Sequence, residues 1–120
     1  MMQPINFTEK FEQIHSYWTP FIVGELNNQW VKLAKLKGEF IWHSHADEDE
    51  LFMVVKGELS IEFRDRMVHL EEGEMCIVPK QTEHKPVARE ECHIMLFEPK
   101  STAHTGEVEH ELTVKNQQWL

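Results

Sequence analysis

Three side chains with metal-ligand chemistry lie close together in the middle of the chain. His43 and His45 are two residues apart, and Glu50 follows after a short acidic run. Because side chains alternate between the faces of an extended strand, the two imidazoles should project to the same side. Imidazole nitrogens and carboxylate oxygens are common protein ligands of Fe, Mn, Ni, Cu and Zn ions. The spacing therefore predicts a site for one divalent transition metal.

A fourth ligand must come from elsewhere, and His84 is the strongest candidate. Pro79 and the Lys-Gln-Thr run after it read as a strand end followed by a turn that could aim the next side chain inward. Two alternatives remain open from the residues alone. An isolated His-x-His pair also fits two surface histidines on an edge strand, and Glu48 competes with Glu50 as the carboxylate ligand. The rest of the acidic run is most simply a solvated loop.

These residues belong to two longer patterns that resemble the motifs of the cupin superfamily, usually written G-x5-H-x-H-x3,4-E-x6-G and G-x5-P-x-G-x2-H-x3-N. The first motif is matched, with four residues rather than five before the first histidine, by Gly38, His43, His45, Glu50 and Gly57. The second is matched by Gly73, Pro79 and His84. Gln81 stands where the motif has its second glycine, and Ala88 where it has asparagine. Both substituted positions have turn and packing roles in the motif, and all four ligand positions are retained.

The resemblance covers about residues 29–99 and implies an all-β fold, a double-stranded β-helix or jelly-roll barrel with a short amino-terminal helix. It extends toward small single-domain bacterial cupins, often labelled as relatives of mannose-6-phosphate isomerase. That activity is not carried over, because a shared barrel does not specify a function. We expect one domain over residues 1–120, divided into an amino-terminal helical segment (1–19), the barrel (20–99) and a carboxy-terminal tail (100–120).

Hydrophobic periodicity predicts one helix followed by short strands. Phe7, Phe11 and Ile14 recur at helical spacing, so a helix is expected near residues 8–15, with Asn6 or Thr8 as its cap. Strands are expected at 21–26, 30–37, 39–45, 51–55, 58–64, 67–70, 75–78, 85–87 and 92–97. Alternation at 58–64 is typical of an outer-edge strand with one wet face, whereas the apolar run 51–55 indicates burial on both faces.

Strand parity indicates which side chains neighbour the metal. Phe52 and Val54 share the face of Glu50 and should line the ligand cavity. Glu39 shares the face of His43 if no bulge intervenes, so it is the candidate catalytic base. The alternative is that Glu39 is a solvated charge at the barrel mouth.

The opposite face of the strand expected at 39–45 carries Phe40 and Trp42, and this apolar face needs a cover. Together with Trp30, these residues would supply the aromatic surface that interfaces favour, so a homodimer is expected. Alternatively, the three aromatic residues fill the space beneath the amino-terminal helix.

The predicted ligand set has a defined chemistry. Three neutral imidazoles and one carboxylate leave a divalent ion with a net charge of about +1 and, in octahedral geometry, two adjacent open positions. Such a centre can polarise a carbonyl or enolate, lower the pKa of bound water or support oxygen chemistry. The resemblance implies dioxygenase, isomerase, lyase or decarboxylase chemistry, so we expect a metal-dependent enzyme acting on a small oxygenated metabolite. The alternative is a non-catalytic cupin that binds a metal or small ligand as a sensor or accessory module.

Composition limits the classes of partner that the chain is expected to bind. The net charge of -9 and scattered basic residues argue against nucleic acid, and weaken a phosphosugar substrate. No run of about 18 apolar residues or signal-peptide pattern occurs, so a cytoplasmic protein with no membrane contact is expected. Cys76 and Cys92 are expected to be free buried thiols. Five histidines without partners at metal spacing are expected to be solvated or core groups: His15, His69, His93, His104 and His110.

Overall fold

Helix α1 (Phe7–Glu12) opens the computed structural model, which describes residues 2–120. Asn6 is its cap, because its side-chain oxygen accepts a hydrogen bond from the backbone N–H of Glu9 at 3.0 Å. The helix ends three residues before the expected boundary, but Phe11 and Ile14 are both buried, as their spacing predicted. Within residues 2–120, no helix has the length and apolar character needed to cross a membrane.

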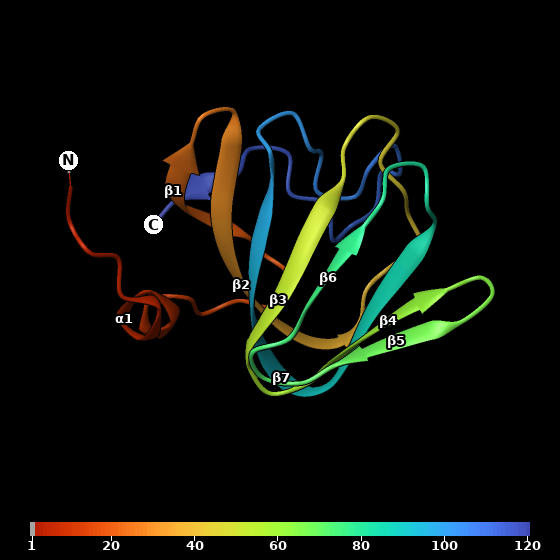
Figure 1. The fold of residues 1–120 in the computed structure, drawn as a ribbon, viewed down its shortest axis with the longest axis horizontal. Coiled ribbons are helices and arrows are strands. Elements are labelled where there is room, and N and C mark those ends of the chain that lie inside the picture. Colours follow the sequence, from red (N-terminus) through yellow and green to blue (C-terminus); the bar gives the residue numbers. More distant parts are fainter. Residues whose placement is uncertain (1) are drawn as a thin grey trace.

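Strands provide the rest of the regular secondary structure among the described residues (Figure 1). They are β1 (Phe21–Leu26), β2 (Gln29–Glu39), β3 (Glu50–Lys56), β4 (Leu59–Phe63), β5 (Met67–Leu70), β6 (Met75–Val78), β7 (His84–Pro99) and β8 (Gln118–Trp119). The bounds of β1, β5 and β6 are those that the sequence predicted. The strands expected at 85–87 and 92–97 are instead one continuous strand, because the charged residues between them stay paired or extended within β7.

The long strand β7 joins the two walls of the barrel. Its first residues pair with β4, a longer stretch pairs with β2, and residues 93–97 also pair with β3, all antiparallel. The sheet order is β5-β4-β7-β2-β1-β8, with β3 lying between β7 and β6. This wrapping gives the expected jelly roll, visible in Figure 1 as strands that fold over one another. The expectation of an edge position for β4 is wrong, since β5 and β7 flank it.

Two apolar clusters hold the fold together. The larger lies inside the barrel and includes Val54, Ile61 and Ile94, each at most 1% exposed. The smaller lies outside the sheet and packs α1, through Phe11, against Leu33 of β2 and its neighbours. β3 alternates between buried and half-buried residues, so only one of its faces is fully buried rather than both.

The strand expected at 39–45 does not form. β2 ends at Glu39, after a register shift between Leu36 and Gly38, and Gly38 adopts a φ of +87°. Phe40 keeps the inward parity of Ala34 and Leu36, and the alternation breaks only between Phe40 and His43, whose ring centroids lie 5.4 Å apart. Phe40 is therefore buried inside the barrel, where its ring stacks on Trp18 with centroids 4.8 Å apart. Phe40 can neither form an exposed dimer surface nor fill the space beneath α1.

The other two aromatic residues have separate surroundings. Trp42 lies beneath the guanidinium of Arg64, 3.8 Å from the ring centroid. Trp30 is partly exposed, and its indole N–H donates to Glu25 at 3.3 Å. The three aromatic residues therefore do not form one shared surface.

Candidate metal centre

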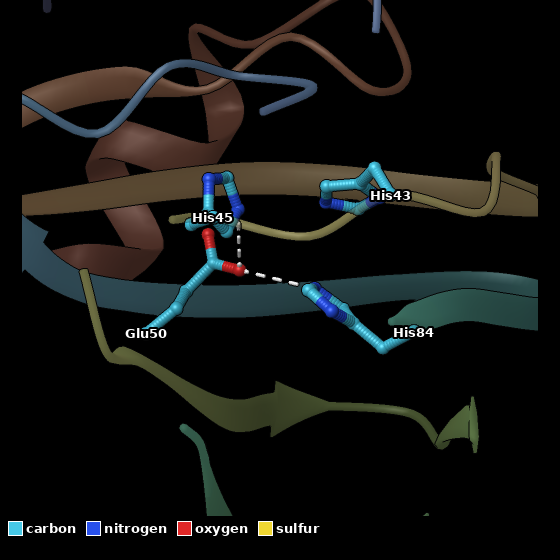
Figure 2. A group of neighbouring side chains, drawn as sticks. All are labelled: His43, His45, Glu50 and His84. Atoms are coloured by element: carbon cyan, nitrogen blue, oxygen red, sulfur yellow. Dashed lines mark ion pairs between the residues drawn. The ribbon is translucent and has the colours of Figure 1, made fainter. Parts of the chain in front are cut away.

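Four side chains converge at one end of the barrel interior. One ligand atom from each of His43, His45, Glu50 and His84 lies within 4.8 Å of the others, and all four residues are buried. Figure 2 shows the rings of His45 and His84 directed at the same carboxylate oxygen of Glu50. Glu50 begins β3 and His84 begins β7, so both are fixed at strand ends.

The backbone around the two histidine segments is tied together by hydrogen bonds. His43 and His84 exchange both backbone hydrogen bonds, at 3.1 and 2.9 Å, in an isolated bridge. The carbonyl of His45 accepts from the N–H of Gln81 at 2.7 Å. Gln81 keeps the left-handed backbone, φ +64°, at the position where the cupin motif has glycine. The substitution therefore leaves the turn before His84 in place.

Hydrogen bonds select the tautomers of two of the imidazoles. Nδ1 of His43 lies 2.9 Å from the carbonyl of Ile41, and Nδ1 of His84 lies 2.9 Å from the carbonyl of Thr82. A carbonyl can only accept, so both Nδ1 atoms carry the proton in the neutral rings. Each Nε2 then presents a lone pair toward the centre, which is the state that a metal ligand requires.

Several polar atoms at the centre have no hydrogen-bond partner in the protein, and a bound cation would provide an interaction for them. Both ring nitrogens of His45, Nε2 of His84 and Oε1 of Glu50 are buried without a hydrogen bond. The Glu50 oxygen lies 3.4 Å from Nε2 of each of these histidines. Leaving buried polar atoms unpaired is costly. The residues therefore fit a transition-metal ion, with three nitrogens and one carboxylate as the donor set.

Burial sets the charge states of the cluster. It lowers the pKa of His43 to about 4, with repulsion from His84 as a smaller cause, so His43 is neutral at pH 7. Burial alone would raise the pKa of Glu50, but His45 and His84 outweigh it and hold that pKa below its usual range. An ionised carboxylate beside neutral imidazoles is the protonation state suited to a divalent cation.

A small apolar cavity adjoins the cluster. It measures about 30 Å³, roughly the space of one or two water molecules. His43, Glu50 and Phe52 line it, and the remaining lining residues are Trp18, Pro20, Ala34, Leu36, Phe40, Pro86, Ile94, Leu96 and His104. Phe52 thus lies where parity placed it. Val54 shares its buried face but packs within the core and does not line this cavity.

Two acidic residues considered from the sequence lie away from the cluster. Glu39 has a side chain that is 64% exposed and pairs with Lys85 at the surface. Its placement therefore gives no support to a catalytic role, which stays a prediction. Glu48 accepts a hydrogen bond from Ser101 at 2.8 Å and is not part of the cluster. Of the two possible carboxylate ligands, the structure brings only Glu50 to the histidines.

Sequence reasoning missed a buried ion pair beside the cluster. Nζ of Lys32 lies 3.3 Å from Oε1 of Glu98, and the two side chains are 1% and 3% exposed. Burial raises the pKa of Glu98 well above its usual range, and the charge of Glu50 raises it further. The ammonium group of Lys32 acts in the opposite direction and favours the ionised carboxylate that pairs with it. Strand parity did indicate that Lys32 is buried, because Lys32 lies on the same face of β2 as the buried Ala34.

A fourth histidine, near the cluster, was also missed. His104 lines the small apolar cavity beside the four predicted ligands, hereafter the metal-side cavity. It belongs to the irregular segment 100–117 that follows β7. Its ring centroid lies 5.1 Å from that of Phe40. No periodicity describes such a segment, so nothing in the sequence distinguished His104 from the other isolated histidines. His69 forms a second, fully exposed group with Glu58 and Glu71, which has the character of an ordinary charged surface.

Comparison with known proteins agrees with this architecture. A family model described as a cupin domain matches residues 29–98. The chain belongs to the cupin family. Its structure is similar to that of a cupin-2 domain protein from Shewanella frigidimarina, with a TM-score of 0.79 and 50% identity over 80% of this chain and 94% of that one. It is also similar to a Neisseria meningitidis protein, with a TM-score of 0.75 and 31% identity over 82% of this cupin and all of that chain.

A curated relative has no described activity. This cupin is 42% identical over 66 residues to YdbB of Bacillus subtilis, described as an uncharacterized protein. The matched region is 54% of this chain and spans 58% of the length of YdbB. The comparisons therefore establish the family and the fold, and the activity must be argued from the site.

Proposed function

We propose that this cupin is a metal-dependent enzyme that acts on a small oxygenated metabolite by dioxygenase, isomerase, lyase or decarboxylase chemistry. The observation that carries the proposal is the convergence of four buried side chains whose central polar atoms have no other partner. His43, His45, Glu50 and His84 would hold one divalent Fe, Mn, Ni, Cu or Zn ion. A bound ion would supply Lewis-acid polarisation of an oxygen and, with a redox-active metal, oxygen chemistry.

The chain's own residues would prepare the site for that chemistry. The carbonyls of Ile41 and Thr82 keep Nε2 of His43 and His84 available to the ion. The apolar walls of the cavity, such as Phe52, exclude bulk water and strengthen electrostatic interactions at the centre. No Lys or Arg lines this cavity, so the substrate we propose is not a phosphosugar. A homodimer and a cytoplasmic location remain part of the proposal.

One observation favours a second function, that of a non-catalytic cupin binding a metal or small ligand as a sensor or accessory module. The cavity of about 30 Å³ has room for only one or two water molecules. A substrate larger than a few atoms would therefore require the surrounding side chains to move. Turnover of any small oxygenated compound by metal-loaded protein distinguishes the enzyme from the binding module.

The test of the metal site is elemental analysis of tag-free protein purified without chelators. We expect near-stoichiometric transition metal in the wild type. Each of His43→Ala, His45→Ala, Glu50→Ala and His84→Ala should lower metal affinity by at least about tenfold, since loss of even an indirect supporting group costs about that much. Circular dichroism should show that each variant keeps the barrel.

His110→Ala is the matched control, because His110 is exposed and lies outside the cluster. This variant should retain the wild-type metal content. Full stoichiometry and affinity in His84→Ala would remove His84 from the ligand set. Absence of metal from the wild type after reconstitution with all five ions would reject the proposed enzyme.

A further inference from the structure

His104 is the one titratable side chain from the carboxy-terminal segment that lines the metal-side cavity. It lines the cavity together with His43 and Glu50, although about 54 residues separate it from Glu50 in the chain. The segment is held against the predicted ligands by a close backbone approach. A Cβ built on Gly106 would lie only 2.0 Å from the carbonyl oxygen of Ser44, the residue between His43 and His45. The position of His104 is thus coupled to the site.

The hydrogen bonding of His104 fixes which ring nitrogen carries its proton. The backbone N–H of Val114 donates to Nδ1 at 2.9 Å. A backbone N–H can only donate, so Nδ1 is the acceptor and Nε2 carries the proton of the neutral ring. Burial lowers the pKa of His104 to about 4, so the ring is neutral at pH 7. His104 consequently offers a single N–H donor, at Nε2.

This donor has no protein acceptor among the described residues. Nδ1 is the only atom of the His104 side chain for which a hydrogen bond is observed, and the ring packs on Phe40 at a centroid distance of 5.1 Å. The other cavity walls are mostly apolar, and their only side-chain acceptors are Glu50 and Nε2 of His43, both of which are predicted metal ligands. A ligand held at the open positions of the metal would therefore be the natural acceptor.

We propose that His104 Nε2–H donates a hydrogen bond to an oxygen of the substrate held beside the metal, and that the substrate is a compact molecule with an apolar body and no phosphate group. The inference rests on the proposed metal site and extends it to the substrate. His104 would orient that oxygen and stabilise negative charge developing there, and a bound metal would supply Lewis-acid polarisation. The apolar walls and the absence of Lys or Arg among them select against phosphorylated and other strongly anionic compounds.

The experiment uses Co²⁺-loaded full-length protein, with azide as a small probe that can bind a metal and accept a hydrogen bond. Azide binding is followed by the visible absorption of Co²⁺, and metal content is measured on the same samples. We expect His104→Phe, which keeps an apolar ring and lacks the donor, to raise the azide Kd by about tenfold, the loss of roughly one hydrogen bond. His104→Gln, which retains an N–H donor, should recover most of this loss.

Three further measurements distinguish a loss of the His104 donor from other causes of weaker azide binding. Metal content should be unchanged in His104→Phe, and His110→Phe should bind azide as the wild type does. Inorganic phosphate should not displace azide from any of these proteins. An unchanged azide Kd in His104→Phe, or equal losses in the Phe and Gln variants, would overturn the role of His104 as donor. Displacement of azide by phosphate would overturn the substrate class, whereas failure of the wild type to bind Co²⁺ would instead reject the metal site itself.

Discussion

Lys32 has the most unusual environment of any single residue in this cupin. Its ammonium group is buried within the barrel wall, and Glu98 is its one ion-pair partner among the described residues. Long charged side chains are almost never fully buried unless they are paired. Glu98 in turn adjoins Glu50, so the pair links the barrel wall to a predicted metal ligand. The stability of this pair is therefore relevant to both the fold and the site.

Replacing Lys32 with Met should destabilise the metal-free protein by about 3–5 kcal/mol, because it leaves Glu98 buried beside Glu50 without a cation. The measurement is the free energy of unfolding from urea denaturation at pH 7. Adding Glu98→Gln to Lys32→Met should recover most of the loss, since both members of the pair are then neutral.

Lys100→Met is the matched control for this prediction. Lys100 pairs with Glu25 at 2.7 Å, but both side chains are more than one third exposed. Such surface pairs contribute about 0–1 kcal/mol. A cost below about 1 kcal/mol for Lys32→Met would show that the buried pair adds little to stability.

Residue spacing was a good predictor where the chemistry lies in short motifs. The structure brings together His43, His45, Glu50 and His84, whose neighbours in sequence already indicated a common site. Lys32 and His104 could not be assigned in this way. Strand parity indicates the burial of Lys32 but not its partner, which depends on the strand that pairs with β2. The role of His104 depends on where the irregular segment 100–117 folds back, and no local pattern encodes this.

At the scale of elements, apolar alternation predicted β1, β5 and β6 with their observed bounds. It failed after β2, because the strand ends at Glu39, and Phe40 and His43 are both buried although strict alternation would place them on opposite faces. It failed again in β7, where Arg89, Glu90 and Glu91 resemble a turn although they are exposed residues of a continuous strand. Side-chain patterns report burial, and they report backbone continuity only indirectly.

The contact between the carboxy-terminal segment and the histidine segment gives a prediction at this scale. Gly106→Ala should detach residues 100–117 from Ser44, because Gly106 has a φ of +61° and its new Cβ would meet the Ser44 carbonyl. Limited trypsin digestion should then cleave at Lys100 and Lys115 faster than in the wild type.

Gly73→Ala separates backbone strain from this collision. Gly73 also has a positive φ, +82°, but a Cβ there would have no atom within 4 Å. The strain alone should cost about 1–2 kcal/mol and leave the digestion of the carboxy-terminal segment unchanged. Equal digestion rates in Gly106→Ala and Gly73→Ala would contradict the docking contact.

For the molecule as a whole, the buried histidines should control how the stability of metal-free protein depends on pH. Burial lowers the pKa of both His43 and His104 to about 4, against about 6.5 in the unfolded chain. The unfolded state therefore binds more protons below pH 6.5, so stability present above that pH is lost as the pH falls toward 4. The lowered pKa of Glu50 acts in the same direction below its ordinary value, whereas the raised pKa of Glu98 opposes it.

We expect the free energy of unfolding of metal-free protein to fall by on the order of 2 kcal/mol between pH 7 and pH 5. The measurement is urea denaturation after chelator treatment and dialysis. His104→Gln should reduce the pH dependence, because one of the two buried imidazoles no longer titrates, whereas His110→Gln should leave it unchanged. In Glu98→Gln protein, which lacks the opposing effect of Glu98, a stability that is flat or rises between pH 7 and pH 5 would mean that protonation of His43 and His104 does not oppose folding. The lowered pKa of Glu50 cannot produce a loss in this range, because unfolded Glu titrates near about 4.3.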